Sequence, residues 1–262
     1  MKRVALIAAF LVAAAFFAEA AVVTKNVDYM QGGTTLQGYL AYDDSIKDKA
    51  PAILIFPEWW GVNNYAEGRA RQLAALGYIA FVADVYGKGV RPRTPAEAGK
   101  TATIYIMDRP LMRARAAAGL DELRSFKNVD TDRIVAIGYC FGGGCALELA
   151  RTEADIKGVV SFHGILGTPL PAKAGDIKAK VLVMHGADDP NTTEEALVAF
   201  ENEMRAAKTD WQINIYGNSV HGFTNPDNGN DNSKGLAYNE KADKRSWKAL
   251  VIFLNEVVGG KD

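Results

Sequence analysis

The order of its apolar segments constrains the fold of this chain more than any other feature of the sequence. Short continuous apolar runs alternate with longer segments that have helical periodicity. A short apolar run is typical of a strand buried on both faces, and strands connected by helices form parallel sheets. We therefore predict an α/β fold, with a mostly parallel central sheet and helices on both faces. The expected strands are 52–56, 78–83, 133–137, 158–162, 181–184 and 211–216, and the expected helices are 64–76, 94–107, 110–126, 142–151, 193–208 and 236–258.

Two segments near the N-terminus, 22–29 and 35–42, are expected to form an antiparallel hairpin. They flank Gln31-Gly-Gly33, and glycines are favoured in the tight turns that join paired strands. No linker-like or low-complexity tract interrupts the 262 residues of the chain. We expect residues 21–262 to form a single domain.

Residues 1–20 have the order of features that is typical of a signal peptide. A short basic start, Met1-Lys-Arg3, precedes an apolar run over 4–17 and the small-x-small site Ala18-Glu-Ala20. The apolar run is shorter than the roughly 18 residues of a membrane-spanning helix. We expect cleavage after Ala20 and a periplasmic or secreted protein with no membrane association after cleavage; an uncleaved anchor is the alternative.

The charge balance excludes two classes of partner. The formal net charge is −1, so there is no basic excess to bind nucleic acid or an anionic membrane surface. We expect a small-molecule partner, no cofactor, no metal and a monomeric protein.

A glycine-flanked cysteine follows one of the expected strands. Gly138-Tyr-Cys140-Phe-Gly142 comes directly after 133–137 and leads into the helical segment 142–151. This spacing is typical of a nucleophile elbow, a sharp turn that glycines permit because they lack a Cβ atom. The N-terminus of the following helix favours the thiolate, which is the reactive form of cysteine. We predict that Cys140 is a catalytic nucleophile; an inert cysteine in a packing turn is the alternative.

The second cysteine, Cys145, raises the possibility of a disulfide, which export would favour. Within a helix, five residues separate two cysteines by about 7 Å along the axis and point their side chains in different directions. Bridged cysteines normally need Cα atoms within about 7 Å. We therefore expect two free thiols, with Cys145 as a small core residue.

A histidine and an acid follow two later strands, as the partners of an activated nucleophile would. His221 lies in a polar loop after 211–216 and is the preferred general base. His163 and His185 also lie at strand ends, and we expect structural roles for both.

The acid is one of two adjacent residues, Asp188 and Asp189. Asp189 is favoured because it lies three residues after Gly186 and directly before Pro190, whereas Asp188 is expected to cap the following loop or helix. The order nucleophile, acid, histidine along the chain is that of the α/β-hydrolases.

On five motifs, the sequence resembles the dienelactone hydrolase family of α/β-hydrolases over essentially the whole mature chain. The resemblance implies a triad of Cys140, His221 and Asp189 that cleaves a small ester or lactone through an acyl-cysteine intermediate. It also implies that Glu58 holds the resting thiol and yields it to the histidine when substrate binds. The motifs are Phe56-Pro-Glu-Trp-Trp-Gly-Val-Asn63, Ala83-Asp-Val-Tyr-Gly87, Gly138-Tyr-Cys-Phe-Gly-Gly143, His185-Gly-Ala-Asp-Asp-Pro190 and His221-Gly-Phe223.

Glu58 also has a physical rationale of its own. A carboxylate near a thiol opposes its ionisation, which would protect a resting cysteine from oxidation outside the cell. The alternative is that Glu58 merely caps the helix expected near Asn64. The backbone N–H groups of Phe141 and Trp59 are expected to form the oxyanion hole, and the side chains of Trp59 and Trp60 either wall the site or pack in the core.

The substrate-binding end departs from the family pattern. The resemblance implies an arginine four residues after the histidine that holds a substrate carboxylate, but this position is Asn225. Trp60, Lys100, Tyr105 and Phe223 are our candidates for substrate contacts. Two alternative functions remain: a non-hydrolytic binding protein that kept the fold, and a thiol-dependent acyltransferase or peptidase.

Overall fold

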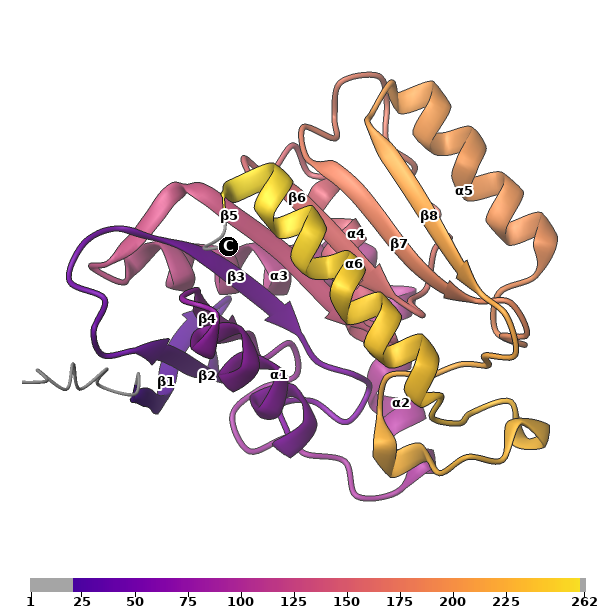
Figure 1. The fold of residues 1–262 in the computed structure, drawn as a ribbon, viewed down its shortest axis with the longest axis horizontal. Helices are drawn as coiled ribbons and strands as arrows, with labels where there is room; N and C mark the ends of the chain where they lie inside the picture. Colours follow the sequence, from indigo (N-terminus) through magenta and orange to yellow (C-terminus); the bar gives the residue numbers. More distant parts are fainter. Residues whose placement is uncertain (1–20, 260–262) are drawn as a thin grey trace, which may run out of the picture.

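The structure is a computed structural model that describes residues 21–259, and these residues contain one eight-stranded sheet (Figure 1). The predicted signal peptide, 1–20, lies outside the described residues. The strands are Val22–Gln31 (β1), Thr34–Asp43 (β2), Ala50–Phe56 (β3), Ile79–Val82 (β4), Val129–Tyr139 (β5), Gly158–Phe162 (β6), Lys180–Gly186 (β7) and Trp211–Tyr216 (β8). The helices are Asn64–Ala75 (α1), Pro95–Met107 (α2), Arg109–Ser125 (α3), Phe141–Ala150 (α4), Glu194–Ala207 (α5) and Glu240–Val258 (α6), with short 3₁₀ turns at Pro226–Asn228 and Asn232–Lys234.

The sheet has the strand order β1-β2-β4-β3-β5-β6-β7-β8. β3 to β8 pair in parallel, whereas β1 pairs with β2, and β2 with β4, in antiparallel fashion. The predicted α/β fold, with its N-terminal antiparallel hairpin, is therefore confirmed. Gly32 and Gly33 join the two hairpin strands with φ values of 52° and 77°, a left-handed conformation that favours glycine in two-residue turns.

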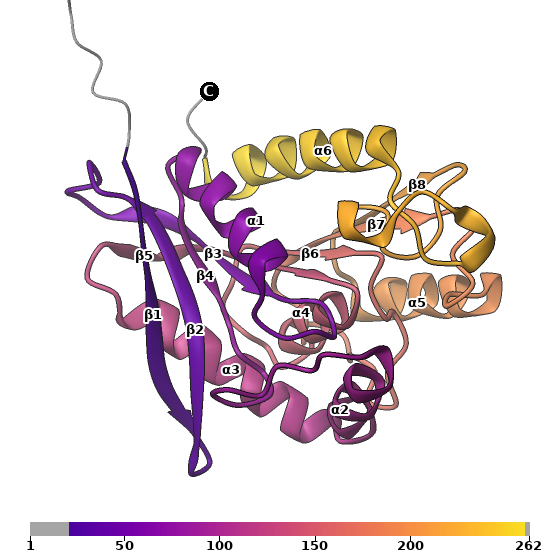
Figure 2. The same cartoon turned by 90° about the horizontal axis from the view of Figure 1, so that it is seen from below.

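Helices cover both faces of the sheet, which explains why the buried strands read as continuous apolar runs. α1 and α6 lie on one face, and α3, α4 and α5 lie on the other (Figure 2). In β3, Ile53 and Ile55 face the first pair of helices, whereas Leu54 and Phe56 face the second group, and all four are fully buried. Burial of one such side chain contributes about 1.5–3 kcal/mol.

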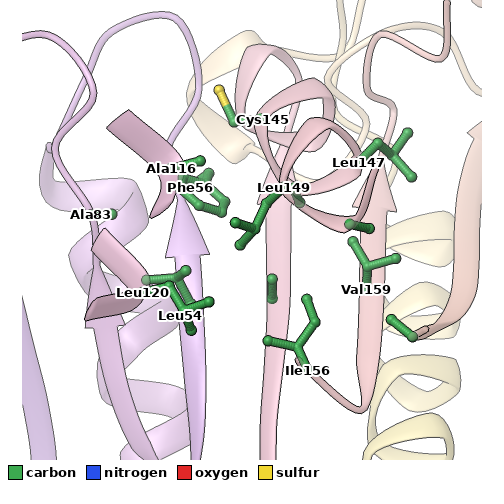
Figure 3. Close-up of a cluster of buried hydrophobic side chains, with 14 of the residues drawn as sticks. Leu54, Phe56, Ala83, Ala116, Leu120, Cys145, Leu147, Leu149, Ile156 and Val159 are labelled. Atoms are coloured by element: carbon green, nitrogen blue, oxygen red, sulfur yellow. The ribbon is translucent and has the colours of Figure 1, made fainter. Parts of the chain in front are cut away.

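The hydrophobic core between the sheet and the helices α3 and α4 adjoins α4, which begins directly after the Cys140 turn. Leu54, Leu120, Leu149 and Ile156 meet between the sheet, α3 and α4 (Figure 3). Cys145 lies on α4 in the same core and is fully buried, as expected.

The last helix begins later than the sequence predicts, at Glu240 rather than residue 236. The side chain of Asn239 accepts hydrogen bonds from the N–H groups of Lys241 and Ala242 and so fixes the first turn there. Leu236, which would have opened the predicted helix, instead forms a parallel bridge with His221. Within residues 21–259, none of the helices has the length and apolar character that a membrane span requires.

Candidate active site

Cys140 occupies the sharp turn between β5 and α4. Its φ of 54° and ψ of −119° lie in a sparsely populated region for a residue with a side chain. Its N–H donates to the carbonyl of Phe162 at 3.0 Å, which ties the turn to the neighbouring strand. A Cβ on Gly138 would lie 1.9 Å from the carbonyl oxygen of Gly142, and a Cβ on Gly142 would lie 2.1 Å from that of Phe56. The flanking glycines are therefore a steric requirement of the turn.

The side chains of Cys140, His221 and Asp189 form a continuous chain of contacts. His221 Nε2 lies 3.0 Å from Cys140 Sγ, and His221 Nδ1 lies 2.8 Å from Asp189 Oδ2. The other oxygen of Asp189 accepts from the N–H of Asn191 at 2.9 Å. Asp189 is buried, whereas the alternative acid, Asp188, is exposed. Of the two candidate acids, Asp189 is the one that contacts the imidazole.

The environment of His221 favours its protonated form. Burial acts to lower the pKa of His221, but the sulfur of Cys140 and the carboxylate of Asp189 outweigh it and raise this pKa to about 10. The backbone of His221 is also fixed, because its N–H donates to Gly235 and its carbonyl accepts from Ala237. This imidazole can take a proton from the thiol and keep it.

The two cysteines have different surroundings. Cys140 is partly exposed and immediately precedes Phe141, the first residue of α4, so free backbone N–H groups adjoin the thiol. Burial raises the pKa of the Cys145 thiol, which keeps it neutral within the core. Of the two thiols, Cys140 is therefore the accessible one.

Glu58 follows β3 and is buried, with 4% of its surface exposed. Its Oε2 accepts a hydrogen bond from Nδ2 of Asn225 at 2.7 Å. Burial raises the pKa of Glu58 to about 7, although the bond from Asn225 opposes the rise. In this conformation Glu58 contacts Asn225, while the thiol contacts His221. The proposed capping role of Glu58 is wrong, because the side chain of Asn63 caps α1 by accepting from Ala66 N–H at 3.1 Å.

Asn225, which stands where the family pattern places an arginine, has a role that the sequence did not indicate. Its Nδ2 is bonded to Glu58, and its Oδ1 accepts from the N–H of Asp227 at 3.0 Å. Only 3% of the residue is exposed. The side chain is bonded to Glu58 and to the backbone of Asp227, and it does not line the pocket that contains Cys140.

Thr224 anchors the segment between His221 and Asn225. Its hydroxyl lies 2.8 Å from Nε2 of His163 and 2.7 Å from the hydroxyl of Tyr65. Its carbonyl accepts from Arg69 at 2.8 Å, and the same guanidinium group pairs with Asp243 at 2.5 Å. No local sequence pattern indicates this anchor, because the contacts of Thr224 join residues up to 159 positions apart.

The two remaining histidines are buried outside the contact chain. His163 bonds to Thr224, and burial lowers its pKa well below the ordinary value. His185 lies in β7, where burial also lowers its pKa. Both side chains are held neutral, in keeping with the structural roles expected of them.

A pocket of roughly 380 Å³ opens in front of the Cys140 sulfur. Apolar side chains form most of its wall, and Glu58 and His221 also reach it. The wall residues besides these are Trp59, Trp60, Ala102, Ile106, Phe141, Ile165, Pro190, Asn191, Asn228, Lys234, Gly235 and Leu236.

The sequence-predicted site residues divide into two groups in the structure. Trp59, Trp60 and Phe141 line the pocket, and the rings of the two tryptophans pack edge to face at 5.3 Å. The predicted oxyanion-hole role of the Trp59 and Phe141 N–H groups stays a prediction.

Lys100, Tyr105 and Phe223 do not line this pocket. Lys100 is exposed on α2. The Tyr105 hydroxyl donates to the carbonyl of Tyr86 at 3.1 Å. Phe223 is fully buried and packs against the ring of His163. Among residues 21–259, no group of three or more His, Cys, Asp or Glu side chains is arranged to hold a metal ion.

The parallel sheet, the strained turn after β5 and the contacts after β7 and β8 together define an α/β-hydrolase. The profile of the dienelactone hydrolase family matches residues 36–258. The chain belongs to the dienelactone hydrolase family.

Related proteins support an ester or lactone hydrolase. The crystal structure of the dienelactone hydrolase-like promiscuous phosphotriesterase P91, from metagenomic libraries, is 42% identical; the match covers 91% of this chain and 100% of that one, with a TM-score of 0.85. A structure named m3DLH is 41% identical over 91% of this chain and 99% of its own, with a TM-score of 0.87. A probable 2-oxo-3-(5-oxofuran-2-ylidene)propanoate lactonase from Bradyrhizobium sp. is 28% identical, covering 91% of this chain and 97% of its own.

Proposed function

We propose that this protein hydrolyses a small carboxylic ester or lactone through a covalent acyl-cysteine intermediate. The observation that supports the proposal most directly is the contact chain from Asp189 through His221 to the Cys140 sulfur. Each contact has the length that proton transfer between a nucleophile, a base and an orienting acid requires.

In the first half of the reaction, His221 Nε2 takes the proton from Cys140 Sγ, and the sulfur attacks the carbonyl carbon. Asp189 keeps the proton of Nδ1 in place and stabilises the imidazolium. The oxyanion is held by the backbone N–H groups of Phe141 and Trp59. The C–O bond to the leaving alkoxide then breaks, and His221 protonates the alkoxide as it departs.

In the second half, water replaces the leaving group. His221 removes a proton from water, the resulting hydroxide attacks the thioester carbon, and the C–S bond breaks. The sulfur recovers its proton from the imidazolium, and the acid product leaves. Apart from water, the cycle consumes no further reactant and changes no oxidation state.

Glu58 regulates the thiol in this proposal. Its carboxylate shares the pocket with Cys140, and an anion there opposes formation of the thiolate. Because the pKa of Glu58 is raised to about 7, the carboxyl can change its charge near neutral pH and so alter the readiness of the sulfur to ionise.

The proposal is tested with aryl esters and small lactones, on wild type beside matched variants. Cys140→Ala should reduce kcat/KM by about 10³-fold or more, whereas Cys145→Ala, in the core, should retain most of the activity. Asp189→Asn should lose far more activity than Asp188→Asn, and intact mass should show an acyl adduct on wild type and Cys145→Ala but not on Cys140→Ala. Folded wild type that binds these compounds without turnover would instead support a binding protein.

The other catalytic alternatives share the same intermediate and differ in the acceptor. An acyltransferase would pass the acyl group to an added alcohol or amine in preference to water, and a peptidase would cleave amides with comparable efficiency. Product analysis in the presence of an added amine therefore separates an acyltransferase from an ester hydrolase, and the rate on an amide analogue of the same ester separates a peptidase from it.

A second candidate substrate is a neutral phosphotriester. The 42%-identical structure is that of a promiscuous phosphotriesterase, and the mostly apolar pocket wall suits an uncharged phosphorus centre. The Cys140 sulfur would attack phosphorus, an aryloxide would leave, and water would release the phosphodiester. A dialkyl aryl phosphotriester should be turned over by wild type and not by Cys140→Ala; equal rates for the two proteins would remove this candidate.

A further inference from the structure

The pocket in front of Cys140 carries most of its polarity at the reacting centre and little elsewhere. Away from Glu58, His221 and the sulfur, most of its wall consists of apolar side chains from the β3–α1 loop, α2 and the loop after β6, among them Trp59, Ile106 and Ile165. Contact with these groups stabilises an apolar ligand by about 25 cal/mol for each Å² of surface removed from water.

One cation, Lys234, belongs to the wall besides His221. Its side chain is 74% exposed, and its Nζ lies 3.7 Å from the carboxylate of Asp231. The ammonium group is therefore at the solvent rim and shares its charge with a neighbouring acid. An ion pair at such exposure contributes at most about 1 kcal/mol.

The remaining polar groups of the wall do not compensate for the lack of a buried cation. Asn228 already donates to the carbonyl of Gly222 at 2.8 Å, and Asn191 is exposed. Apart from the triad imidazole, the only buried ionisable group in the wall is the carboxyl of Glu58. This carboxyl already accepts a hydrogen bond from the amide of Asn225. A second carboxylate placed in this pocket would lose its hydration, gain no buried cation and meet an acid of the same sign, each of which is unfavourable.

We infer that the acyl part of the substrate is uncharged and apolar, and that Trp59, Ile106 and Ile165 select it. The inference rests on the proposed function and narrows its substrate class, from esters and lactones in general to those whose acid carries no second carboxylate.

The test compares three 4-nitrophenyl esters that share a leaving group: the hexanoate, the hydrogen adipate and the methyl adipate. The first two match in chain length and differ by a terminal carboxylate, and the third restores neutrality with added bulk. Wild type should favour hexanoate and methyl adipate over hydrogen adipate in kcat/KM by at least about 10-fold, after subtraction of the spontaneous rate. Equal or greater kcat/KM for hydrogen adipate overturns the inference and leaves the hydrolase assignment intact, whereas no Cys140-dependent turnover of any ester overturns the proposed function.

A designed cation gives an independent measurement. Ile106→Lys places an ammonium group in the apolar wall and should shift the hydrogen adipate to hexanoate ratio toward the anion by about 10-fold or more. Ile104→Lys is the matched control, because Ile104 lies on the same helix, is 54% exposed and does not line the pocket. A ratio that moves equally in the two variants, with both folded by circular dichroism, would overturn the inference. So would a wild-type preference for hydrogen adipate that Lys234→Ala abolishes.

Discussion

Replacing Glu58 by glutamine should make the protein more stable than wild type at neutral and higher pH. Glutamine keeps the volume of the side chain and an oxygen that can accept the Asn225 hydrogen bond, but it cannot ionise. The variant therefore isolates the cost of ionising one buried carboxyl, which is 4% exposed in the folded protein.

The magnitude follows from the two pKa values of Glu58. Burial raises the folded-state pKa to about 7 from an ordinary value of 4.5. Below pH 4.5, Glu58 is protonated in both the folded and the unfolded wild type, so it does not disfavour folding. As the pH rises from 4.5 to about 7, the unfolded chain releases a proton that the folded protein retains, so the unfolded state gains stability. At about 1.4 kcal/mol per pH unit, the wild type loses about 3 kcal/mol across this window, and the loss is complete above it.

The measurement is urea unfolding of both proteins, followed by tryptophan fluorescence, at about pH 5 and about pH 8. Groups that titrate in both proteins cancel in the difference, so the advantage of Glu58→Gln should grow by about 2–3 kcal/mol from the lower to the higher pH. Glu194→Gln, which removes an exposed glutamate from α5, is the control for loss of a charge without burial. A difference that stays constant with pH, within about 0.5 kcal/mol, would refute the argument that Glu58 is buried with a raised pKa.

Four further measurements test the remaining steps. Glu58→Gln should react faster with iodoacetamide at neutral pH, because a nearby anion that opposes thiol ionisation is removed, and should hydrolyse esters more slowly, because the carboxylate that yields the thiol to His221 on substrate binding is lost; equal alkylation rates by mass spectrometry would contradict the gating role. Gly142→Ala should destabilise by about 3 kcal/mol or more, since a Cβ would lie 2.1 Å from the last carbonyl oxygen of β3, while Gly167→Ala, with nothing within 4 Å of its Cβ, should keep the wild-type Tm. Thr224→Val should cost about 1–3 kcal/mol in urea unfolding and lower kcat more than it raises KM, because the buried His163 and the half-buried Tyr65 each lose a hydrogen-bond partner; an unchanged kcat would confine Thr224 to folding. The exported protein should begin at Ala21 and carry two alkylatable thiols by intact mass, and a bridged form that resists alkylation would contradict the free-thiol prediction.

The sheet and the contact chain around Cys140 were predictable from the sequence for a common reason. The functional residues follow β5, β7 and β8, and the carboxyl ends of parallel strands gather at one edge of a sheet. Local patterns therefore sufficed to bring Cys140, Asp189 and His221 together. The start of α6 was misplaced because the apolar pair 236–237 imitates a first helical turn, whereas the side-chain cap at Asn239 decides the boundary.

The predicted substrate contacts on α2 show what such local patterns cannot predict. Ala102 and Ile106 lie one turn apart and reach the pocket, while Tyr105, one position away, turns toward the core and bonds to Tyr86. A rotation of about 100° per residue separates a wall residue from a core residue. The sequence locates this helix near the site without fixing which of its faces meets the pocket.

The segment 221–225 contributes to the site through residues that were not predicted, besides the predicted His221; the predicted Phe223 does not line the pocket. His221 is the proposed base, Thr224 is anchored by Tyr65 and His163, and Asn225 donates to Glu58. Because these residues share one short stretch of backbone, a shift of the Thr224 anchor would displace both the imidazole that contacts the thiol and the amide that donates to Glu58. The segment thus links the two groups that, in the proposed mechanism, govern the charge of the sulfur. Because Asn225 is buried and lies outside the pocket wall, the proposed recognition of the substrate falls to the apolar residues of that wall.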